Sequence, residues 1–479
     1  MRAGRRRAAA AALTGAVLLA GCSTSDSPDP APRPTSTPDA AGWPEPRADR
    51  PVVDLRFDVA EDLETVSGAE RVVFTPDLDT CVLVFRSWPN KPATARAGSG
   101  LTVSEVRVDG EPAEVRDVPA GAPDSAPAGT LQEVPLPECA EPGEEITVEL
   151  EFEVELGPDV NERVGTAGGV DVAWFATAFP LLAWERGRGW DRSPAVAVAG
   201  EMTVSEDFEL ASLEVVADSR YEVLGIGEAV GTSDGPGDTT VHEFTAPSVR
   251  DVAVTVGELD VQSAEIGGVR VHVGLDEGVE EATAAEWLAR LEESMGALVA
   301  LLGPFPYDDL WVSVLSSQTS GIEFPGAIQF GDVDPDFRRA LVTHELAHMW
   351  FYGLVGNNQA VHPWLDESFA TFAQMVVHGE GSASMADLPG SRRHGVGEPI
   401  QYWEQFRRPS SAYYDTVYIV GGTTLADART RLGVEAFDAA LQEYLRANAW
   451  SIATPDDVQE AFAELPEVLT ELERVGALP

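Results

Sequence analysis

The chain has 479 residues, 44% of them hydrophobic and 23% charged, which is typical of a folded globular protein. This length exceeds what one hydrophobic core usually supports, so we expect two domains together with export and linker segments. Asp and Glu outnumber Lys and Arg by 80 to 32, for a formal net charge of -48. A charge of this sign and size keeps the protein soluble and excludes nucleic acid as an expected partner.

The first residues, MRAGRRRAAAAALTGAVLLAGC, place a run of arginines before an apolar stretch that is too short to span a bilayer. This pattern is typical of an export signal. The stretch ends in Leu19-Ala20-Gly21-Cys22, which resembles the lipobox of bacterial lipoproteins. The resemblance implies that residues 1–21 are removed and that lipid on Cys22 anchors the protein to the extracytoplasmic side of the cell membrane. An ordinary cleaved signal followed by a chance cysteine is the alternative.

Residues 22–48 are rich in Ser, Pro, Asp and Thr and contain almost no large apolar side chain, so they predict a disordered tether. Beyond Cys22 the chain has two cysteines, Cys81 and Cys139. Because an exported chain meets an oxidising compartment, this even pair predicts a disulfide. Two buried free thiols remain the alternative, since spacing alone does not bring two sulfur atoms together.

Short alternating or β-branched runs, broken by Gly, Pro and Asp, recur over residues 49–258 and predict strands. These runs are VVDLRFDV, RVVFT, CVLVFRSW, LTVSEVRVD, EITVELEFEVEL, EMTVSE, LEVVADS and DVAVTVGEL. So many strands without helical periodicity between them predict a β-rich N-terminal domain of saddle or sandwich type.

The pattern changes in residues 259–479, which we expect to form a second, mostly helical domain. The run EEATAAEWLARLEESMGALVALLG places apolar residues at helical spacing and stops at Gly303-Pro304. A strand, DLWVSVLSS, is followed by predicted helices over 335–355, 363–378, 418–432 and 434–447. The fold class is therefore α+β, with the β-rich domain first and the helical domain second.

The segment DPDFRRALVTHELAHMWFYGLV carries a candidate metal site. Asp334 as N-cap and a proline directly after it predict that a helix begins there. On this helix His344 and His348 are four residues apart, which places both imidazoles on one face, with Glu345 beside them. HELAH thus matches HExxH, in which two histidines bind zinc and the glutamate acts as general base.

A catalytic zinc takes three protein ligands and leaves a fourth position for water, so a third ligand is required. Glu367 follows on the predicted helix of PWLDESFATFAQMVVHGE, which a turn-forming stretch allows to fold back beside the first helix. His344, His348 and Glu367 therefore predict one zinc ion at a hydrolytic site, where the metal and Glu345 activate the water.

HELAHMWF followed by WLDESFATF resembles the HExxH-x18-E and WLNEGFA pattern of the M1 family, the gluzincin aminopeptidases. The segment SGIEF, residues 320–324, lies where that family has its GxMEN exopeptidase motif, which makes Gly321 and Glu323 candidates for substrate binding. The family's order of a β-rich domain and a thermolysin-like zinc domain also fits residues 49–479. No long helical-repeat region follows in this sequence, so the resemblance implies a short form of the family.

The resemblance also implies roles for single residues. Glu345 would take a proton from the zinc-bound water and pass it to the leaving amine. Tyr418, which opens YIVGG where the family has its catalytic tyrosine, would donate its phenolic O–H to the oxyanion. Glu323 would bind the free α-ammonium group of the peptide, which restricts cleavage to N-terminal residues. Tyr413 and Tyr414 compete for the role of Tyr418.

Several positions depart from the family pattern. The exopeptidase motif has Ser320, Ile322 and Phe324 in place of Gly, Met and Asn. The WLNEG motif has Asp366 and Ser368 in place of Asn and Gly. The β-rich domain offers no recognisable second polar residue for the substrate amine, so exopeptidase specificity is less firmly indicated than hydrolysis.

We therefore expect a zinc metallopeptidase, and within that class an aminopeptidase that acts on extracytoplasmic peptides. A zinc endopeptidase or another amide hydrolase is the alternative among enzymes. A non-catalytic lipoprotein that keeps the fold as a binding module is the alternative outside them. The expected partners are peptide substrates and, through Cys22, the membrane.

Overall fold

The computed structural model describes residues 42–118, 129–158, 162–198, 200, 203–379, 385 and 388–479. The predicted export signal, Cys22 and most of the predicted tether fall in residues 1–41, outside the described residues. The tether prediction is wrong at residues 42–44, because the ring of Trp43 packs against the core and its Nε1–H donates to the carbonyl of Pro304 at 3.0 Å. Residues Ala41–Pro479 group into one compact unit. Within its described part, buried apolar side chains from both halves of the sequence form one continuous core, and no helix is long and apolar enough to cross a membrane. The boundary at residue 258 stays a prediction.

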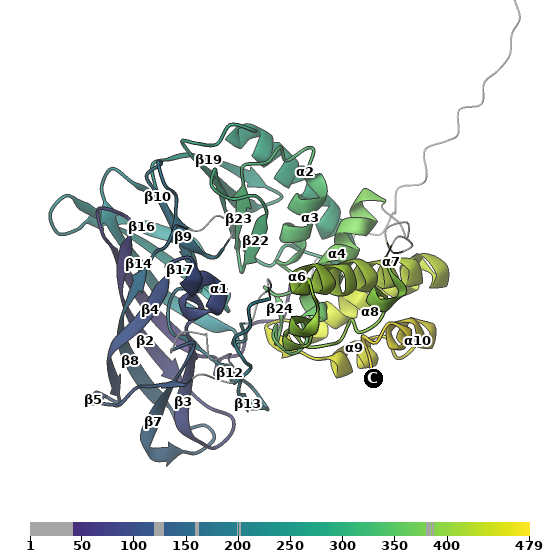
Figure 1. Ribbon diagram of the computed structural model, residues 1–479, viewed down its shortest axis with the longest axis horizontal. Helices are drawn as coiled ribbons and strands as arrows, with labels where there is room; N and C mark the ends of the chain where they lie inside the picture. The colour runs from purple at the N-terminus through teal and green to yellow at the C-terminus, as the bar shows by residue number, and fades with distance from the viewer. Residues whose placement is uncertain are drawn as a thin grey trace, which may run out of the picture. The chain divides into compact units, whose positions relative to one another are not determined.

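An eight-stranded sheet is the largest element of the N-terminal half (Figure 1). Its strands follow the order β16-β17-β14-β1-β2-β8-β4-β5. Their bounds are β1 Val52–Val59, β2 Thr65–Phe74, β4 Gly100–Val108, β5 Glu111–Pro112, β8 Ile146–Glu155, β14 Phe208–Asp218, β16 Glu228–Asp234 and β17 Thr239–Val249. Every second side chain of β1 and β8 is buried, so one face of this sheet packs against the core.

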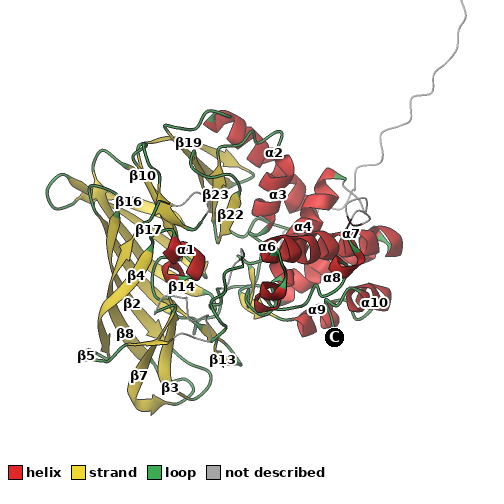
Figure 2. Ribbon diagram, viewed as in Figure 1, coloured by secondary structure: helices red, strands yellow, loops and turns green. Residues whose placement is uncertain are grey.

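Two four-stranded sheets and a short hairpin complete this half, whose helical content is small (Figure 2). The first sheet has the order β15-β18-β10-β9, the second β11-β3-β7-β6, and the hairpin pairs β12 with β13. The bounds are β3 Thr80–Arg86, β6 Arg116–Val118, β7 Leu131–Ala140, β9 Val164–Thr166, β10 Val172–Ala176, β11 Leu181–Leu182, β12 Trp184–Glu185, β13 Gly189–Trp190, β15 Glu222–Leu224 and β18 Ala253–Gly257, with η1 Trp88–Asn90 and α1 Pro92–Arg96 after β3.

Cys81 and Cys139 are joined by a disulfide. Cys81 lies on β3 and Cys139 on β7, and these two strands are antiparallel neighbours. The bond links residues 58 positions apart. In the chain-entropy picture, a loop of this length stabilises the folded state by about 4 kcal/mol, because the crosslink restricts the unfolded chain.

A five-stranded sheet of order β19-β20-β21-β23-β22 opens the C-terminal half. The bounds are β19 Leu259–Ile266, β20 Val269–Asp276, β21 Asp309–Leu315, β22 Gly321–Phe324 and β23 Ala327–Gly331. Strands β20, β21 and β23 run parallel, and β22 is an antiparallel edge strand. This edge strand carries most of the SGIEF segment and packs beside α3 (Figure 1).

Helices make up most of the remaining chain. Their bounds are α2 Ala284–Leu302, α3 Arg339–Ala347, α4 Trp364–His378, α6 Pro409–Tyr413, α7 Gly421–Leu432, α8 Val434–Ala447, α9 Pro455–Ala461 and α10 Pro466–Arg474, with a π-helix η4 over Tyr414–Val420 and short helices η2 Gly390–Arg392 and η3 Ile400–Gln405. Two short strands, β24 Val355–Asn357 and β25 Ser451–Ala453, pair in parallel. Helix α2 begins after a capping box formed by Thr283 and Glu286. It ends before Gly303, which is the stop that its sequence predicts.

The helix of the HELAH segment is shorter than predicted, since α3 begins at Arg339 and ends at Ala347. Asp334 was predicted to cap the helix. Its Oδ1 instead accepts hydrogen bonds from the backbone N–H groups of Asp336 and Phe337 and closes a turn before the helix. The predicted N-cap is therefore wrong, because the aspartate satisfies a local turn rather than the first turn of α3.

The predicted strand EMTVSE is also wrong over residues 203–206, which form no strand. Backbone groups of this stretch bond to remote residues instead of a neighbouring strand. The N–H of Gln359 donates to the carbonyl of Thr203, and the guanidinium of Arg250 donates to the carbonyl of Ser205. Because these partners satisfy its polar groups, the stretch needs no sheet neighbour.

Candidate metal centre

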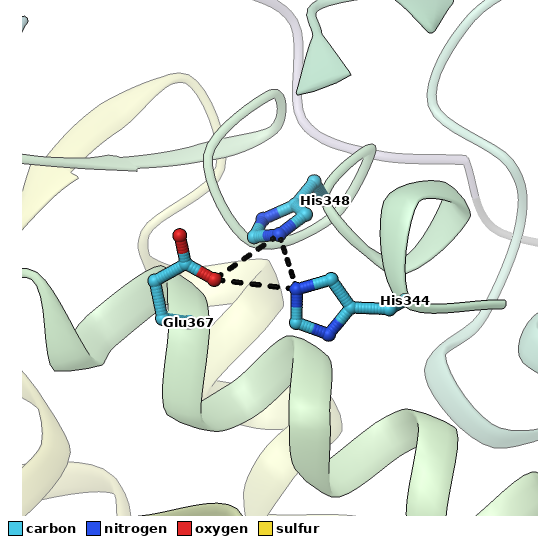
Figure 3. Close-up of side chains that lie close together, drawn as sticks. All are labelled: His344, His348 and Glu367. Carbon is cyan, nitrogen blue, oxygen red and sulfur yellow. Dashed lines mark hydrogen bonds and ion pairs between the residues drawn. The ribbon is translucent and has the colours of Figure 1, made fainter. Parts of the chain in front are cut away.

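The three predicted metal ligands converge on one point (Figure 3). Nε2 of His344 lies 3.2 Å from Nε2 of His348 and 3.3 Å from Oε2 of Glu367. Nε2 of His348 lies 3.5 Å from the same carboxylate oxygen. Atoms bound at about 2.0–2.1 Å around a tetrahedral zinc are about 3.3–3.4 Å apart. The three ligand atoms therefore have the spacing that zinc requires.

All three ligands are buried, and their neighbours orient them. His344 lies on α3, His348 directly follows it, and Glu367 lies in the first turn of α4. The Nδ1–H of His348 donates to the carbonyl of Phe351 at 3.0 Å. This bond assigns the proton to Nδ1 and leaves Nε2 free to bind a metal.

Glu345 and Glu323 lie together beside His348. Carboxylate oxygens of the two glutamates and a ring nitrogen of His348 all lie within 4.8 Å of one another. Gly321 makes this close approach possible, since a Cβ atom there would lie 2.4 Å from Cγ of Glu345. The candidate base, the candidate amine-binding residue and a metal ligand thus form one cluster.

Tyr418 reaches this cluster from the π-helix that precedes α7. Its hydroxyl donates to Oε1 of Glu367 at 2.5 Å, and its ring stacks on His344 with the centroids 5.7 Å apart. Single-turn π-helices are frequent at functional sites because they re-aim side chains. Of its two competitors, Tyr414 lines the same cavity and Tyr413 is buried.

Ser368, at the position of a glycine in the M1 pattern, has a structural role in this arrangement. Its hydroxyl donates to the carbonyl of Val417 at 2.6 Å. Val417 directly precedes Tyr418 in the sequence. Gly421 faces this serine, and a Cβ atom at Gly421 would lie 2.0 Å from the serine Oγ. The serine hydroxyl thus links α4 to the π-helix that carries Tyr418.

A cavity of about 530 Å³ opens over the cluster. Glu323, Glu345 and Glu367 supply its carboxylates, and the exposed rings of Phe337 and Tyr414 contribute aromatic surface. A cavity of this size lies within the range of small-molecule sites, which is about 300–1,000 Å³. The site therefore has room for a short segment of peptide.

Burial and neighbouring charges set the pKa values of the ligands. Burial lowers the pKa of His344. Burial opposes ionisation of Glu367, but the imidazoles of His344 and His348 beside it outweigh burial and hold its pKa well below the usual range. Burial also lowers the pKa of His348, but the carboxylates of Glu323 and Glu367 outweigh burial and raise it. The ligand carboxylate is thus ionised and ready to bind a cation.

The structure adds Arg163, which no sequence motif indicated. This side chain is 1% exposed, and its Nη2 lies 3.3 Å from Oε1 of Glu323. Its Nη1 lies 3.5 Å from Oδ2 of Asp251, and its guanidinium carbon lies 5.0 and 4.8 Å from the ring centroids of Trp88 and Phe324. Arg163 directly precedes β9, so the β-rich half contacts the SGIEF segment through this residue.

Asp251 extends the contact to the turn after α3. Its Oδ2 accepts hydrogen bonds from Thr177 at 2.6 Å and from the hydroxyl of Tyr352 at 3.2 Å. Burial raises the pKa of Asp251 to about 6, although Arg163 opposes the shift. Tyr352 has a φ of 112°, a strained value for a residue other than glycine. The hydrogen bond from Tyr352 to Asp251 fixes the side chain of this strained residue.

The fold and the site together have the features of a zinc metallopeptidase. Residues 336–476 match the family description "Peptidase family M1 domain". Leucine aminopeptidase 2 of Aspergillus niger is 24% identical over 263 residues, which are 50% of this chain and 41% of that protein. Aminopeptidase M1 of Arabidopsis thaliana is 28% identical over 133 residues, which are 26% of this chain and 15% of that protein. The matched parts are thus less than half of these relatives.

Solved structures resemble the chain over most of its length. The M1 zinc metallopeptidase of Deinococcus radiodurans superposes with a TM-score of 0.63 at 17% identity and covers 91% of this chain and 97% of its own. A structure of that metallopeptidase bound to a Tyr-Ser-Ala substrate gives the same TM-score and coverage. The predicted α+β fold is therefore confirmed, and the resemblance to the M1 family is confirmed for residues 336–476.

Proposed function

We propose that the protein is a zinc-dependent aminopeptidase that removes N-terminal residues from peptides. The observation that carries this proposal is the zinc-matched spacing of His344, His348 and Glu367 in the same cavity as Glu345. Relatives named as aminopeptidases, and a structure of the same fold solved with a tripeptide substrate, support peptides as the substrate class. One zinc ion is expected, since the three ligands form a single group.

When bound, zinc supplies a Lewis acid that polarises the carbonyl of the cleaved bond and eases ionisation of a water molecule. Glu345 accepts the proton of the attacking water and delivers it to the leaving nitrogen, so that an acid and an amine are formed. Tyr418 releases Oε1 of Glu367 and donates its O–H to the carbonyl oxygen, where negative charge develops. Glu345 is buried and Tyr418 is partly buried, so water screens both interactions less than it would at an open surface.

Glu323 determines which peptide bond is presented. The α-nitrogen and the carbonyl carbon of one residue are about 2.5 Å apart, because only two bonds join them. Oxygens of Glu323 and Glu345 lie within 4.8 Å of each other. A peptide whose ammonium group binds Glu323 therefore presents its first peptide bond to Glu345.

The contact between Arg163 and Glu323 favours a second candidate function, that of a zinc endopeptidase or another amide hydrolase. A guanidinium nitrogen 3.3 Å from Glu323 offsets part of the negative charge that attracts an ammonium group. Glu323 nevertheless lines the cavity, and Arg163 contacts it from the β-rich half. We propose that Arg163 holds this carboxylate in place and leaves its other oxygen for the substrate.

The variant Glu323→Gln tests the choice between the candidates. Glutamine has nearly the same shape as glutamate, and its amide oxygen can still accept a hydrogen bond from Arg163. The substitution removes the negative charge that pairs with the ammonium group. Losing one partner of a buried charge pair costs about 2–5 kcal/mol, so kcat/KM for free-amine peptides should fall roughly 30-fold or more. We expect the unmutated protein to cleave the N-acetylated form of the same peptide slowly, with little further change in the variant. Chromatography of the products measures all four rates.

Two outcomes would contradict the proposal. One is rapid internal cleavage of acetylated peptides by the unmutated protein, at a rate that Glu323→Gln does not change. This result would show that the protein is an endopeptidase. Binding of peptides by the zinc-loaded protein without any cleavage would establish the non-catalytic binding module.

We propose an extracytoplasmic location with a lipid anchor at Cys22. The support is the arginine run, the short apolar stretch and the lipobox-like end of the signal in the sequence. A tether over residues 22–41, the part of the predicted tether that precedes the contacts of Trp43 and Pro44 with the folded unit, would then hold the peptidase away from the bilayer.

A further inference from the structure

One side of helix α3 lines the active-site cavity from the first residues before the helix to its end. Phe337, Arg338, Leu341, Glu345 and His348 all contribute to the cavity wall. Arg338, Leu341, Glu345 and His348 follow one another at intervals of three or four residues, which places these four on one face. Arg338 is thus connected to the zinc ligands by a continuous surface.

Arg338 is the one Arg or Lys among the described residues that line this cavity. Its side chain is exposed, and within the described residues its guanidinium makes no hydrogen bond or ion pair. An unpaired guanidinium at a cavity wall is suited to bind a carboxylate of the ligand, because its planar donors match the two oxygens.

The backbone position of Arg338 sets the scale of the distance between such a carboxylate and the cleaved bond. Arg338 is the residue directly before α3 and precedes His344 by six residues, so their backbones are about 9 Å apart along the helix axis. An extended peptide spans about 3.3–3.6 Å per residue. The carboxylate is therefore two or three residues beyond the cleaved bond, which corresponds to the C-terminus of a tripeptide or tetrapeptide cut after its first residue.

The surroundings of Arg338 agree with a binding surface. Phe337 is 84% exposed and Tyr414 is 52% exposed, and both line the same cavity. Large exposed aromatic side chains beside a cavity are typical of contact surfaces for ligands, since water is displaced from them at low cost. These two rings would contact the side chains of the substrate residues between the cleaved bond and the C-terminus.

We propose that Arg338 binds the C-terminal carboxylate of short peptides, so that tripeptides and tetrapeptides with a free C-terminus are the preferred substrates. This inference rests on the proposed aminopeptidase function. It goes beyond that function because Glu323 selects a free N-terminus, whereas Arg338 selects a peptide length by binding the C-terminal carboxylate.

The test compares a tripeptide acid with its C-terminal amide in the unmutated protein and two variants. Arg338→Gln removes the charge. Arg339→Gln is the matched control, because Arg339 is also exposed and makes no side-chain bond among the described residues, but it does not line the cavity. We expect amidation to lower kcat/KM roughly tenfold to a hundredfold in the unmutated protein and in Arg339→Gln, mainly through KM, as for the loss of one charge-assisted hydrogen bond. In Arg338→Gln the acid should be cleaved no better than the amide.

A third substrate separates the two possible sources of the carboxylate. A tripeptide amide with aspartate at its last position carries a side-chain carboxylate but no free C-terminus. If the terminal carboxylate is recognised, this peptide should behave as an amide. Cleavage of the aspartyl amide at the rate of the free acid, with the same dependence on Arg338, would overturn selection of the C-terminus and show recognition of acidic side chains instead.

A binding measurement gives a readout that does not depend on turnover. In the background of Glu345→Gln, calorimetry should show tighter binding of the acid than of the amide, and Arg338→Gln should remove the difference. Equal affinity and equal cleavage of acid and amide by the unmutated protein would overturn this inference alone. Absence of cleavage of both would overturn the proposed function and, with it, the substrate preference.

Discussion

Replacing Glu345 with glutamine is expected to abolish nearly all peptide hydrolysis while the protein keeps its zinc. The amide cannot accept the proton of the attacking water, and loss of a general base lowers the rate by about 10²–10⁴-fold. Glutamine has nearly the same shape, so it fits the space that Gly321 leaves. The measurement is the turnover number on a free-amine tripeptide together with the zinc content of the same sample.

The control for this prediction is His348→Ala, which removes a ligand rather than the base. We expect that variant to lose both zinc and activity, because two protein ligands remain where a catalytic zinc takes three. Unchanged turnover in Glu345→Gln would rule out the role of Glu345 as base. Loss of zinc from Glu345→Gln would mean that the variant does not separate binding from chemistry.

Arg163→Met is expected to lower the free energy of unfolding by roughly 3–5 kcal/mol, the range found when one partner of a buried ion pair is removed. Methionine fills much of the space but leaves Glu323 and Asp251 as buried carboxylates without their cation. Denaturant unfolding measured against the unmutated protein tests this. Adding Asp251→Asn and Glu323→Gln to the variant should recover part of the loss, because the buried charges are then gone.

A matched control is Arg71→Met on β2. Its partner Asp54 lies 3.3 Å away, and the two side chains are 44% and 42% exposed. Pairs exposed to this extent contribute about 0–1 kcal/mol, because solvent screens them. If Arg163→Met lowers the free energy of unfolding no more than Arg71→Met does, a structural role for the buried ion pairs of Arg163 is contradicted.

Arg163 also has an expected effect on substrate binding that a merely structural role would not produce. If it positions Glu323, Arg163→Lys should keep a cation at the site and so retain most of the stability. It should nevertheless raise KM for free-amine peptides more than it lowers kcat, because the two-pronged geometry of the guanidinium is lost. Equal KM values in the lysine variant and the unmutated protein would leave Arg163 with a stabilising role only.

The zinc ligands were predictable because the information is local. Two histidines four residues apart share a helix face, and Glu367 follows on the next helix, so the chain needs only one turn to bring them together. Most strands and the helices α2, α4 and α8 were predictable for the same reason, since periodicity and capping residues mark them within a few positions.

The contacts that join the two halves were not predictable. Arg163 is 160 positions from Glu323, and no spacing rule relates a residue before one strand to an edge strand of another sheet. The stretch that ends at Glu206 alternates like a strand, yet it bonds to Gln359 and other remote groups. The π-helix before α7 is a further case, because helical periodicity does not reveal the extra residue that aims Tyr418 at Glu367.

The measurement that tests the central claim most directly is the zinc content of the purified protein, determined alongside hydrolysis of a free-amine tripeptide before and after chelation. We expect about one zinc per chain, loss of hydrolysis when the metal is removed, and recovery when zinc is returned. Hydrolysis that continues at an unchanged rate in the metal-free protein, or full zinc occupancy in His348→Ala, would contradict the assignment of a catalytic zinc to His344, His348 and Glu367.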